Sequence, residues 1–359
     1  MDQPHTATGE FRLLGPLPEA VGVSYVMPVL NEAGHLANAV SAVLAQQYEG
    51  ESELIIALGA STDDTDAIAA ELAAADPRVR LVPNPASDVS SGLNVAIRAS
   101  RFPVVIRVDA HSDLSDGYTR TAVAALRRTG AANLGGVMVA KGNPGVQAAI
   151  ARAYNSPFGL GGGVYHHGTE ERPADSAYLG VFRREVLFEV GLFDETQRRG
   201  QDWEMNSRLR AAGYLVLFVP DLEVDYWPRA SLESLRRQMY ATGVWRGHLA
   251  RRQGRSPLRY LPPPLVAVIV IGSVVCLLGQ ALGVVRGTGS RVAGVFHVGA
   301  IGYVAGATTV AMARLGGRGP VDRLLNAAVL VIMHLSWGLG FLRGVVFGAE
   351  RTVDRSRVR

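Results

Sequence analysis

The sequence contains a single cysteine, Cys276, and a single lysine, Lys141, among 359 residues. One cysteine excludes a disulfide scaffold and any zinc or iron–sulfur site made from a cluster of cysteines. Charged residues are also scarce, at 19% of the chain against roughly 25% in an ordinary soluble domain. A disordered chain would be polar and highly charged, so this composition excludes one. The net charge of +4 is carried almost entirely by arginine, and we expect no nucleic-acid partner.

The first 20 residues lack the features of a secretory signal peptide. They have neither a basic start nor an apolar run of about 7–15 residues, so we expect the domain that follows to remain in the cytosol. By composition the chain divides into an N-terminal tail (1–20), a mixed α/β domain (21–230), a basic amphipathic segment at a membrane interface (231–262), an apolar region (263–348) and a basic tail (349–359).

Long apolar runs are confined to the C-terminal region. A membrane-spanning helix needs about 20 mostly apolar residues. Leu265–Val285 meets this requirement, and Val292–Ala313 and Leu324–Gly348 meet it more loosely. We therefore expect about three transmembrane helices. Arg343 interrupts the third run, and its expected places are near an interface or facing a polar groove.

Arginines precede the first apolar run and indicate its orientation. The cytoplasmic flanks of membrane-spanning helices are enriched in Lys and Arg. These arginines therefore predict a multi-pass protein of the plasma membrane whose N-terminal domain is cytoplasmic. Leu232–His248 mixes arginines with apolar residues, which is typical of a helix lying on the membrane surface. Three crossings would place the tail outside, and its four arginines argue mildly against that, which leaves a re-entrant last segment or a count different by one as alternatives.

The domain at 21–230 alternates predicted strands and helices. The strands are Val23–Val29, Glu53–Leu58, Val79–Val82 and Val104–Val108, and the helices are His35–Gln47, Ile68–Ala75 and Ser91–Ala99. This order predicts a mostly parallel sheet covered by helices on both faces. In such sheets ligands bind at the carboxyl ends of strands. Polar clusters fall at three of these ends, at Asn31–Glu32, Gly59–Asp64 and Asp109–Asp113.

Seven motifs follow one another in this domain. They are PVLNE (28–32), GASTDDT (59–65), SGLN (91–94), RVDAH (107–111), YLGVFRREV (178–186), GLFDE (191–195) and GQDWEMNSRLRAAGY (200–214). In this order they resemble a family 2 glycosyltransferase, in particular the membrane-bound, succinoglycan-biosynthesis-type branch. The resemblance covers about residues 21–230. It implies a GT-A fold (Rossmann-like, with a mostly parallel sheet), a nucleotide-sugar donor, a divalent metal (Mn²⁺ or Mg²⁺) and inversion at the anomeric carbon.

The resemblance places the metal at the end of the fourth predicted strand. Asp109 and His111 occupy the positions of the family's Asp-x-Asp motif, with histidine in place of the second aspartate. A cation there would neutralise the diphosphate leaving group. The alternative is that Asp109 caps the next element and His111 is solvated.

The donor nucleotide and sugar would bind around the first two strand ends. The candidate residues are Pro28, Val29, Asn31, Glu32, Gly59, Ser61, Asp63, Asn94 and Asp109. Leu58 stands where the family usually has an aspartate that contacts the base, so Asp63 or backbone groups near Gly59–Ser61 would have to replace that contact.

Inversion requires a base that removes the proton of the acceptor hydroxyl, and one positioned carboxylate suffices. Asp202 in GQDWE matches the family's catalytic aspartate; the alternative is that it caps a helix. Weaker candidates for the acceptor side or the interface are Trp203, Glu204, Gln238, Trp245 and Arg246. The glycine-rich stretch Phe158–His167 is a candidate acceptor or donor loop.

We therefore expect an inverting, metal-dependent glycosyltransferase that acts on a lipid-linked or membrane-proximal acceptor in polysaccharide or cell-envelope synthesis. A processive polysaccharide synthase is the first alternative, but Gln238–Arg246 does not match its Gln-x-x-Arg-Trp motif. The second is a non-catalytic scaffold that binds nucleotide-sugars, which Leu58 and His111 favour and Asp202 disfavours. No Gly-x-Gly-x-x-Gly follows the first strand, which argues against a dehydrogenase.

Overall fold

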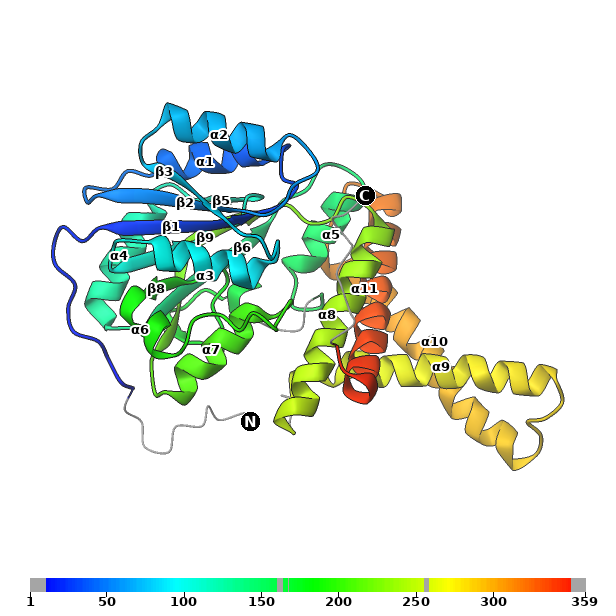
Figure 1. Ribbon diagram of the computed structural model, residues 1–359. Coiled ribbons are helices and arrows are strands. Elements are labelled where there is room, and N and C mark those ends of the chain that lie inside the picture. The colour runs from blue at the N-terminus through cyan, green and yellow to red at the C-terminus, as the bar shows by residue number, and fades with distance from the viewer. Residues whose placement is uncertain (1–10, 160–163, 167, 255–257, 350–359) are drawn as a thin grey trace. The chain divides into compact units, whose positions relative to one another are not determined.

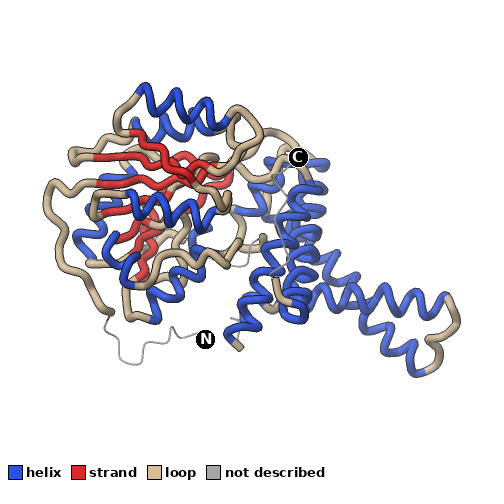
Figure 2. Tube along the Cα trace, viewed as in Figure 1, coloured by secondary structure: helices blue, strands red, loops and turns tan. Residues whose placement is uncertain are grey.

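The computed structural model describes residues 11–159, 164–166, 168–254 and 258–349. It divides into two compact units. The sheet unit comprises Gln3–Val139 and Val164–Trp227, and the helical unit comprises Ala140–Gly163 and Pro228–Arg359. Most of the expected basic tail and part of the glycine-rich stretch Phe158–His167 lie outside the described residues. Figure 2 shows that the strands gather in the sheet unit, while the helical unit consists of helices and loops.

The N-terminal half of the sheet is parallel. Its strands are β1 (Val23–Val29), β2 (Ser52–Leu58), β3 (Val79–Pro83) and β4 (Val104–Arg107), in the spatial order β3-β2-β1-β4. They coincide with the four predicted strands to within one residue. Because all four run the same way, their carboxyl ends meet at one edge of the sheet, as expected for a ligand-binding α/β fold.

The other half of the described sheet continues the order as β8-β6-β9-β5, with β7 paired to β9. These strands are β5 (Ser112–Leu114), β6 (Asn133–Ala140), β7 (Arg172–Pro173), β8 (Val181–Arg183) and β9 (Val216–Tyr226). β8 runs antiparallel to both β4 and β6, so β6 shares the direction of β1 to β4. β9 is antiparallel to β5 and β7. The predicted α/β class with mostly parallel strands is confirmed, with antiparallel pairings in this half.

Helices cover both faces of the sheet (Figure 1). They are α1 (Leu36–Leu44), α2 (Thr65–Ala75), α3 (Val89–Ala99), α4 (Tyr118–Thr129), α6 (Arg184–Glu189) and α7 (Gln201–Ala211). Strand residues alternate between two hydrophobic clusters: Ile56 packs with the first cluster, beside α1 and α4, and Ile55 with the second, beside α3 and α7. This period of two is what a strand buried on both faces requires.

The helical unit contains α5 (Val146–Tyr154), α8 (Leu232–Gln253), α9 (Pro262–Ala281), α10 (Thr288–Arg314) and α11 (Pro320–Phe347). Short 3₁₀ turns occur at η1 (Val164–His166), in the sheet unit, and η2 (Leu258–Tyr260). Among the described residues, α9, α10 and α11 are long and apolar enough to cross a membrane. The expectation of three such helices is confirmed by length and composition.

Glycines bring α8 and α11 into backbone contact. A Cβ atom at Gly340 would meet the carbonyl oxygen of Tyr240, and one at Gly344 would meet that of Val244. Later positions on one helix meet later positions on the other, so the two helices run parallel. The apolar side chains of α8, including Leu235 and Trp245, are buried in protein, whereas a helix lying alone on a membrane would expose them to lipid.

Gly340→Ala is expected to destabilise the helical unit, because backbone atoms of α8 occupy the place of the new methyl group. Overpacking of this kind costs about 1–3 kcal/mol, which exceeds the roughly 1 kcal/mol gained in helix propensity. Gly302→Ala on α10 is the matched control, since nothing lies within 4 Å of its Cβ position. Thermal unfolding of detergent-purified protein measures both; equal or higher melting temperatures for Gly340→Ala would contradict the backbone contact.

Candidate active site

Two loops at the carboxyl ends of β1 and β2 are joined by hydrogen bonds. The side-chain oxygen of Asn31, which has a positive φ of 55°, accepts from the backbone N–H of Thr62 at 2.7 Å. The backbone N–H of Glu32 donates to Oγ1 of Thr65 at 2.8 Å. Asp63 accepts hydrogen bonds from Thr65, which lower the pKa of its carboxyl group. These contacts fix Glu32 at the edge of the sheet.

The turn after β4 presents Asp109 and His111. The hydroxyl of Ser112 donates to the backbone carbonyl of Asp109 at 2.8 Å and accepts from its N–H at 3.2 Å, which closes the turn. Nδ1 of His111 lies 3.1 Å from Oε1 of Glu32, and Nε2 lies 3.8 Å from Oδ2 of Asp109. With its proton on Nδ1, the imidazole donates to Glu32, and its Nε2 faces Asp109.

Arg107 joins the end of β4 to the start of α7. One guanidinium nitrogen donates to Oδ1 of Asp109 at 3.1 Å, and another forms a short ion pair with Oδ1 of Asp202. The Arg107 side chain is only 5% exposed, and that of Asp202 is 25% exposed. Residues two apart on an extended chain point the same way, so Arg107 and Asp109 share one side of the chain. Asp109, the candidate metal ligand, and Asp202, the candidate base, therefore both bind the guanidinium of Arg107.

Burial and the oppositely charged neighbours shift the pKa values of Asp202 and Arg107 in opposite directions. Burial raises the pKa of Asp202, the positive charge of Arg107 lowers it, and the negative charge of Asp109 raises it; the net direction is upward. Burial disfavours the charged form of Arg107, but the two carboxylates prevail and its pKa is raised. Arg107 therefore stays charged at every physiological pH.

Tyr178 is a further polar group beside this cluster. Its hydroxyl is buried, and no described residue provides it with a hydrogen-bond partner. Burial, followed by the negative charge of Asp109, raises its pKa well above the ordinary value, so the phenol stays protonated. Its ring packs edge-on against Tyr226, which in turn lies edge-on to His111.

Sequence reasoning missed Arg107 and Tyr178, although both lie in motifs that it identified. A charged residue within the apolar strand VVIRV was a usable signal, because a buried arginine requires anionic partners. The Tyr178 position had no such signal, since a tyrosine next to a strand is ordinarily a core residue.

The other donor-binding candidates of the sheet unit lie at the ends of β1 and β2. Pro28 and Val29 end β1, and the N–H of Gly59 donates to the carbonyl of Val29 at 2.9 Å. Oγ of Ser61 accepts from the N–H of Asn31 at 3.2 Å, and Leu58 ends β2. These residues therefore lie in or next to the joined loops.

Asn94 and Glu204 are instead engaged in contacts that hold the fold together. The Asn94 amide bonds to both backbone groups of Phe193 and to the carboxylate of Glu195. Both carboxylate oxygens of Glu204 accept from Arg208 at 2.7 Å, one turn along α7. Trp203, next to Asp202, is partly buried. A contact of these three side chains with substrate stays a prediction.

Gln238, Trp245 and Arg246 belong to the helical unit. Gln238 accepts from the hydroxyl of Tyr154 at 3.3 Å, and Trp245 is only 4% exposed. Arg246 lies over the ring of Tyr260, 4.5 Å from its centroid. Both of these contacts join residues of the helical unit.

The donor set at the sheet edge fits a divalent cation that is completed by substrate. Among the described residues, no group of three or more His, Cys, Asp or Glu side chains converges on one point. Mg²⁺ is ordinarily held by one or two carboxylates together with substrate phosphates, and imidazole suits several transition metals. Oδ2 of Asp109 and Nε2 of His111, 3.8 Å apart, are near enough to ligate one ion at about 2.1 Å each.

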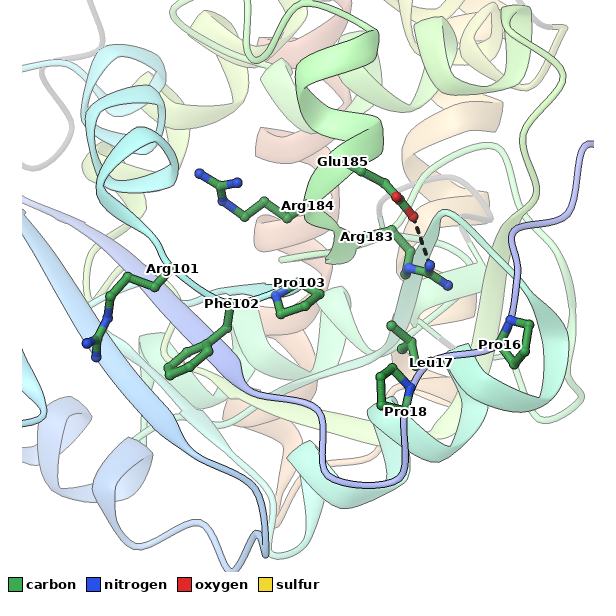
Figure 3. A pocket seen from close by; sticks show the side chains of 9 residues that line it. All are labelled: Pro16, Leu17, Pro18, Arg101, Phe102, Pro103, Arg183, Arg184 and Glu185. Carbon is green, nitrogen blue, oxygen red and sulfur yellow. Dashed lines mark hydrogen bonds and ion pairs between the residues drawn. The ribbon is translucent and has the colours of Figure 1, made fainter.

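A pocket at the other end of β4 contains none of these residues (Figure 3). It is lined by Pro16, Leu17, Pro18, Arg101, Phe102, Pro103, Arg183, Arg184 and Glu185. Its arginines are already paired, for example Arg183 with Glu185 at 2.8 Å. The candidate site is therefore the polar cluster at the carboxyl ends of the strands.

A mixed sheet with a polar cluster at this edge is the arrangement expected for a GT-A glycosyltransferase. Comparisons agree: the sequence model of Glycosyl transferase family 2 matches residues 24–191. The succinoglycan biosynthesis protein ExoA of Rhizobium meliloti (strain 1021) is 32% identical over 321 residues, or 89% of this chain and 93% of that protein. A solved structure of the mannosyltransferase PcManGT from Pyrobaculum calidifontis, in complex with GDP-Man and Mn²⁺, has a TM-score of 0.57 at 16% identity, covering 94% of this chain and 91% of its own.

The chain belongs to glycosyltransferase family 2 and is a glycosyltransferase with the GT-A fold. The resemblance drawn from the seven motifs is confirmed.

Arg107→Met is expected to lower the free energy of unfolding by about 3–5 kcal/mol, because it leaves the carboxylates of Asp109 and Asp202 without the guanidinium that both of them bind. Adding Asp202→Asn should restore part of this loss, since the amide carries no charge. Arg128→Met is the control: Arg128 pairs with Glu171 on the surface, and such pairs contribute at most about 1 kcal/mol. Thermal unfolding without nucleotide measures all three variants. Equal effects of Arg107→Met and Arg128→Met would show that the ion pairs of Arg107 contribute no more to stability than a surface pair.

Proposed function

We propose that the protein is an inverting, metal-dependent glycosyltransferase that moves a sugar from a nucleotide-sugar to a lipid-linked or membrane-proximal acceptor. The observation that carries this proposal is Arg107, which holds the candidate base Asp202 next to the candidate metal ligand Asp109. The 32% identical relative is named for succinoglycan biosynthesis, which supports a role in polysaccharide or cell-envelope synthesis. The similar solved structure contains GDP-Man and Mn²⁺, which supports a nucleotide-sugar donor and a divalent cation.

Asp109 and His111 are the residues that would hold the metal. When bound, the cation would neutralise charge on the diphosphate leaving group. Glu32 accepts a hydrogen bond from Nδ1 of His111 and so orients Nε2, an arrangement that recurs around metal-ligating histidines. Glu32 therefore acts through His111.

Asp202 would accept the proton of the acceptor hydroxyl. Burial raises its pKa, which makes it a stronger base than a solvated aspartate, and the positive charge of Arg107 opposes that shift. Proton removal requires the ionised carboxylate, and the charge of Arg107 favours that form.

The joined loops after β1 and β2 would bind the nucleoside. The carboxylate of Asp63 is already used by the backbone N–H of Ala33 and by Thr65. We therefore assign recognition of the base to backbone groups around Gly59–Ser61, which compensates for Leu58 at the end of β2.

The helical unit would anchor the enzyme in the plasma membrane with the sheet unit in the cytoplasm. Support comes from the apolar helices α9, α10 and α11 and from the arginines that precede α9, since basic residues accumulate on the cytoplasmic side.

Asp202→Asn should reduce transfer by about 10²- to 10⁴-fold, the usual contribution of a general base, while donor affinity changes by less than about threefold. UDP-, GDP- and TDP-sugars are first screened with Mn²⁺ by thermal shift; calorimetry with the sugar that stabilises the protein then gives affinity, and radiolabel transfer to membrane lipids gives the rate. Asp221→Asn, an exposed residue of β9, is the control. A parallel loss of donor binding and activity would assign Asp202 to the donor site instead.

His111→Ala should raise the Mn²⁺ concentration needed for half-maximal donor binding by more than about 10- to 100-fold, the loss that follows when only the hydrogen-bond partner of a metal-ligating histidine is mutated. Glu32→Gln should raise it less, because the amide can still orient the imidazole. Both are measured by titrating Mn²⁺ at fixed donor concentration. A Mn²⁺ titration that is unchanged in His111→Ala would remove this residue from the metal site.

A further inference from the structure

Three helices of the helical unit could span a membrane by composition, but their surroundings differ. In the most apolar window of α9 17% of the residues are buried in protein, and in that of α10 11%. The corresponding share for α11 is 50%. Apolar composition in α11 is therefore accounted for largely by neighbouring helices, while α9 and α10 expose large side chains such as Val275 (60%) and Val295 (73%).

The main neighbour of α11 is a helix that is too polar to cross a bilayer. α8 runs parallel to α11 in backbone contact at Gly243, Gly247, Gly340 and Gly344. α8 carries Arg236, Arg237, Arg246, Arg251 and Arg252. An orientation of α11 across the membrane would take the neighbouring arginines of α8 into the hydrocarbon with it.

Arg246 shows where a membrane-spanning α11 would bring an arginine into the hydrocarbon. Its guanidinium lies over Tyr260, and Tyr260 stacks on Trp337, three residues from the midpoint of α11. A spanning α11 would thus carry an arginine near its central turns. Arginine, tyrosine and tryptophan are instead typical of the boundary between lipid and water, which matches a pair of helices lying along that boundary.

We propose that only α9 and α10 cross the bilayer, as a two-helix hairpin, and that α11 lies with α8 along the cytoplasmic membrane surface. Figure 1 shows α9 leaving the α8–α11 pair transversely and returning through α10. The proposal rests on the cytoplasmic location of the sheet unit proposed above. The partner of α11 is the lipid surface, reached by a partly exposed apolar stripe that includes Ala328, Leu335, Leu339 and Leu342.

The distribution of arginine agrees independently with two crossings. The turn between α9 and α10 contains Arg286 alone, and Arg291 follows in the first turns of α10. With two crossings, Arg314, Arg318 and the four arginines of the sequence after residue 350 are all cytoplasmic. With three crossings those four would be outside, against the usual bias.

Single cysteines test the number of crossings in the full-length chain. The only native cysteine is replaced (Cys276→Ala), and Asp221→Cys, Thr288→Cys and Thr352→Cys report on the sheet unit, the hairpin turn and the C-terminal sequence. A membrane-impermeant maleimide is applied to intact and to permeabilised cells, and each variant is first checked for transferase activity. We expect labelling in intact cells at position 288 only, and at 221 and 352 only after permeabilisation.

Other outcomes are distinguishable. Labelling of 352 but not of 221 in intact cells means three crossings and overturns the proposal. Protection of 288 in intact cells, with labelling after permeabilisation, means that the hairpin does not cross and also overturns it. Labelling of 221 in intact cells overturns the cytoplasmic orientation of the proposed function, whereas 221 and 352 on the same side still means an even number of crossings.

Depth measurements test the surface position of α11 directly. Nitroxide labels at Ala328, Leu335 and Leu342, seven residues apart, should lie at similar shallow depths in liposomes, as judged by relative accessibility to oxygen and to a water-soluble nickel chelate. The matched set, at Val268 and Val275 on α9 and at Leu282 directly after it, should show a clear maximum of depth at Val275. A maximum at Leu335 equal to that at Val275 would show that α11 spans.

Discussion

The ion pairs of Arg107 are the constraint on which the candidate site depends. A buried guanidinium requires anionic partners, and here Asp109 at the end of β4 and Asp202 at the start of α7 supply them. The same contact sets Asp202 beside Asp109. It also opposes the effect of burial on the pKa of the Asp202 carboxyl group. Arg107 thereby connects folding stability to the geometry of proton removal.

The histidine in place of a second aspartate becomes understandable from its contacts. Glu32, from the loop after β1, occupies one ring nitrogen of His111 and leaves the other directed towards Asp109. The hydrogen bonds between the loops after β1 and β2 in turn hold Glu32. A substitution in either loop would therefore affect the candidate metal site indirectly, through Glu32 and His111.

In the helical unit, hydropathy has two different physical causes. Residues of α9 and α10 are apolar and mostly exposed, which requires lipid around them. Residues of α11 are apolar because α5, α8, α9 and α10 surround much of that helix. Mean hydropathy does not distinguish a helix surrounded by lipid from a helix buried in protein. The reason is that transfer from water to lipid and transfer from water to a protein interior have similar free energies per area.

Much of the fold could be predicted from sequence because its signals are local. Runs such as VSYVMPV and ELIIAL specify strands through β-branched and apolar residues, and β1 to β4 lie where these runs predict. Candidate residues at the first two strand ends also came together, since parallel strands end at one edge. The engagement of Asn94 with Phe193 and of Glu204 with Arg208 could not be foreseen, because these partners are set by the packing of α3 and α7.

The sequence by itself determined the family, the alternation of strands and helices, and which residues stand at the strand ends, since each depends on neighbours along the chain. Only the tertiary structure decided that Arg107 joins Asp109 to Asp202, that His111 is held by Glu32, and that α11 packs along α8. The long-range contacts among these join residues 79 to 100 positions apart. Which distant groups meet depends on the simultaneous packing of all the elements between them, and no local pattern contains that information.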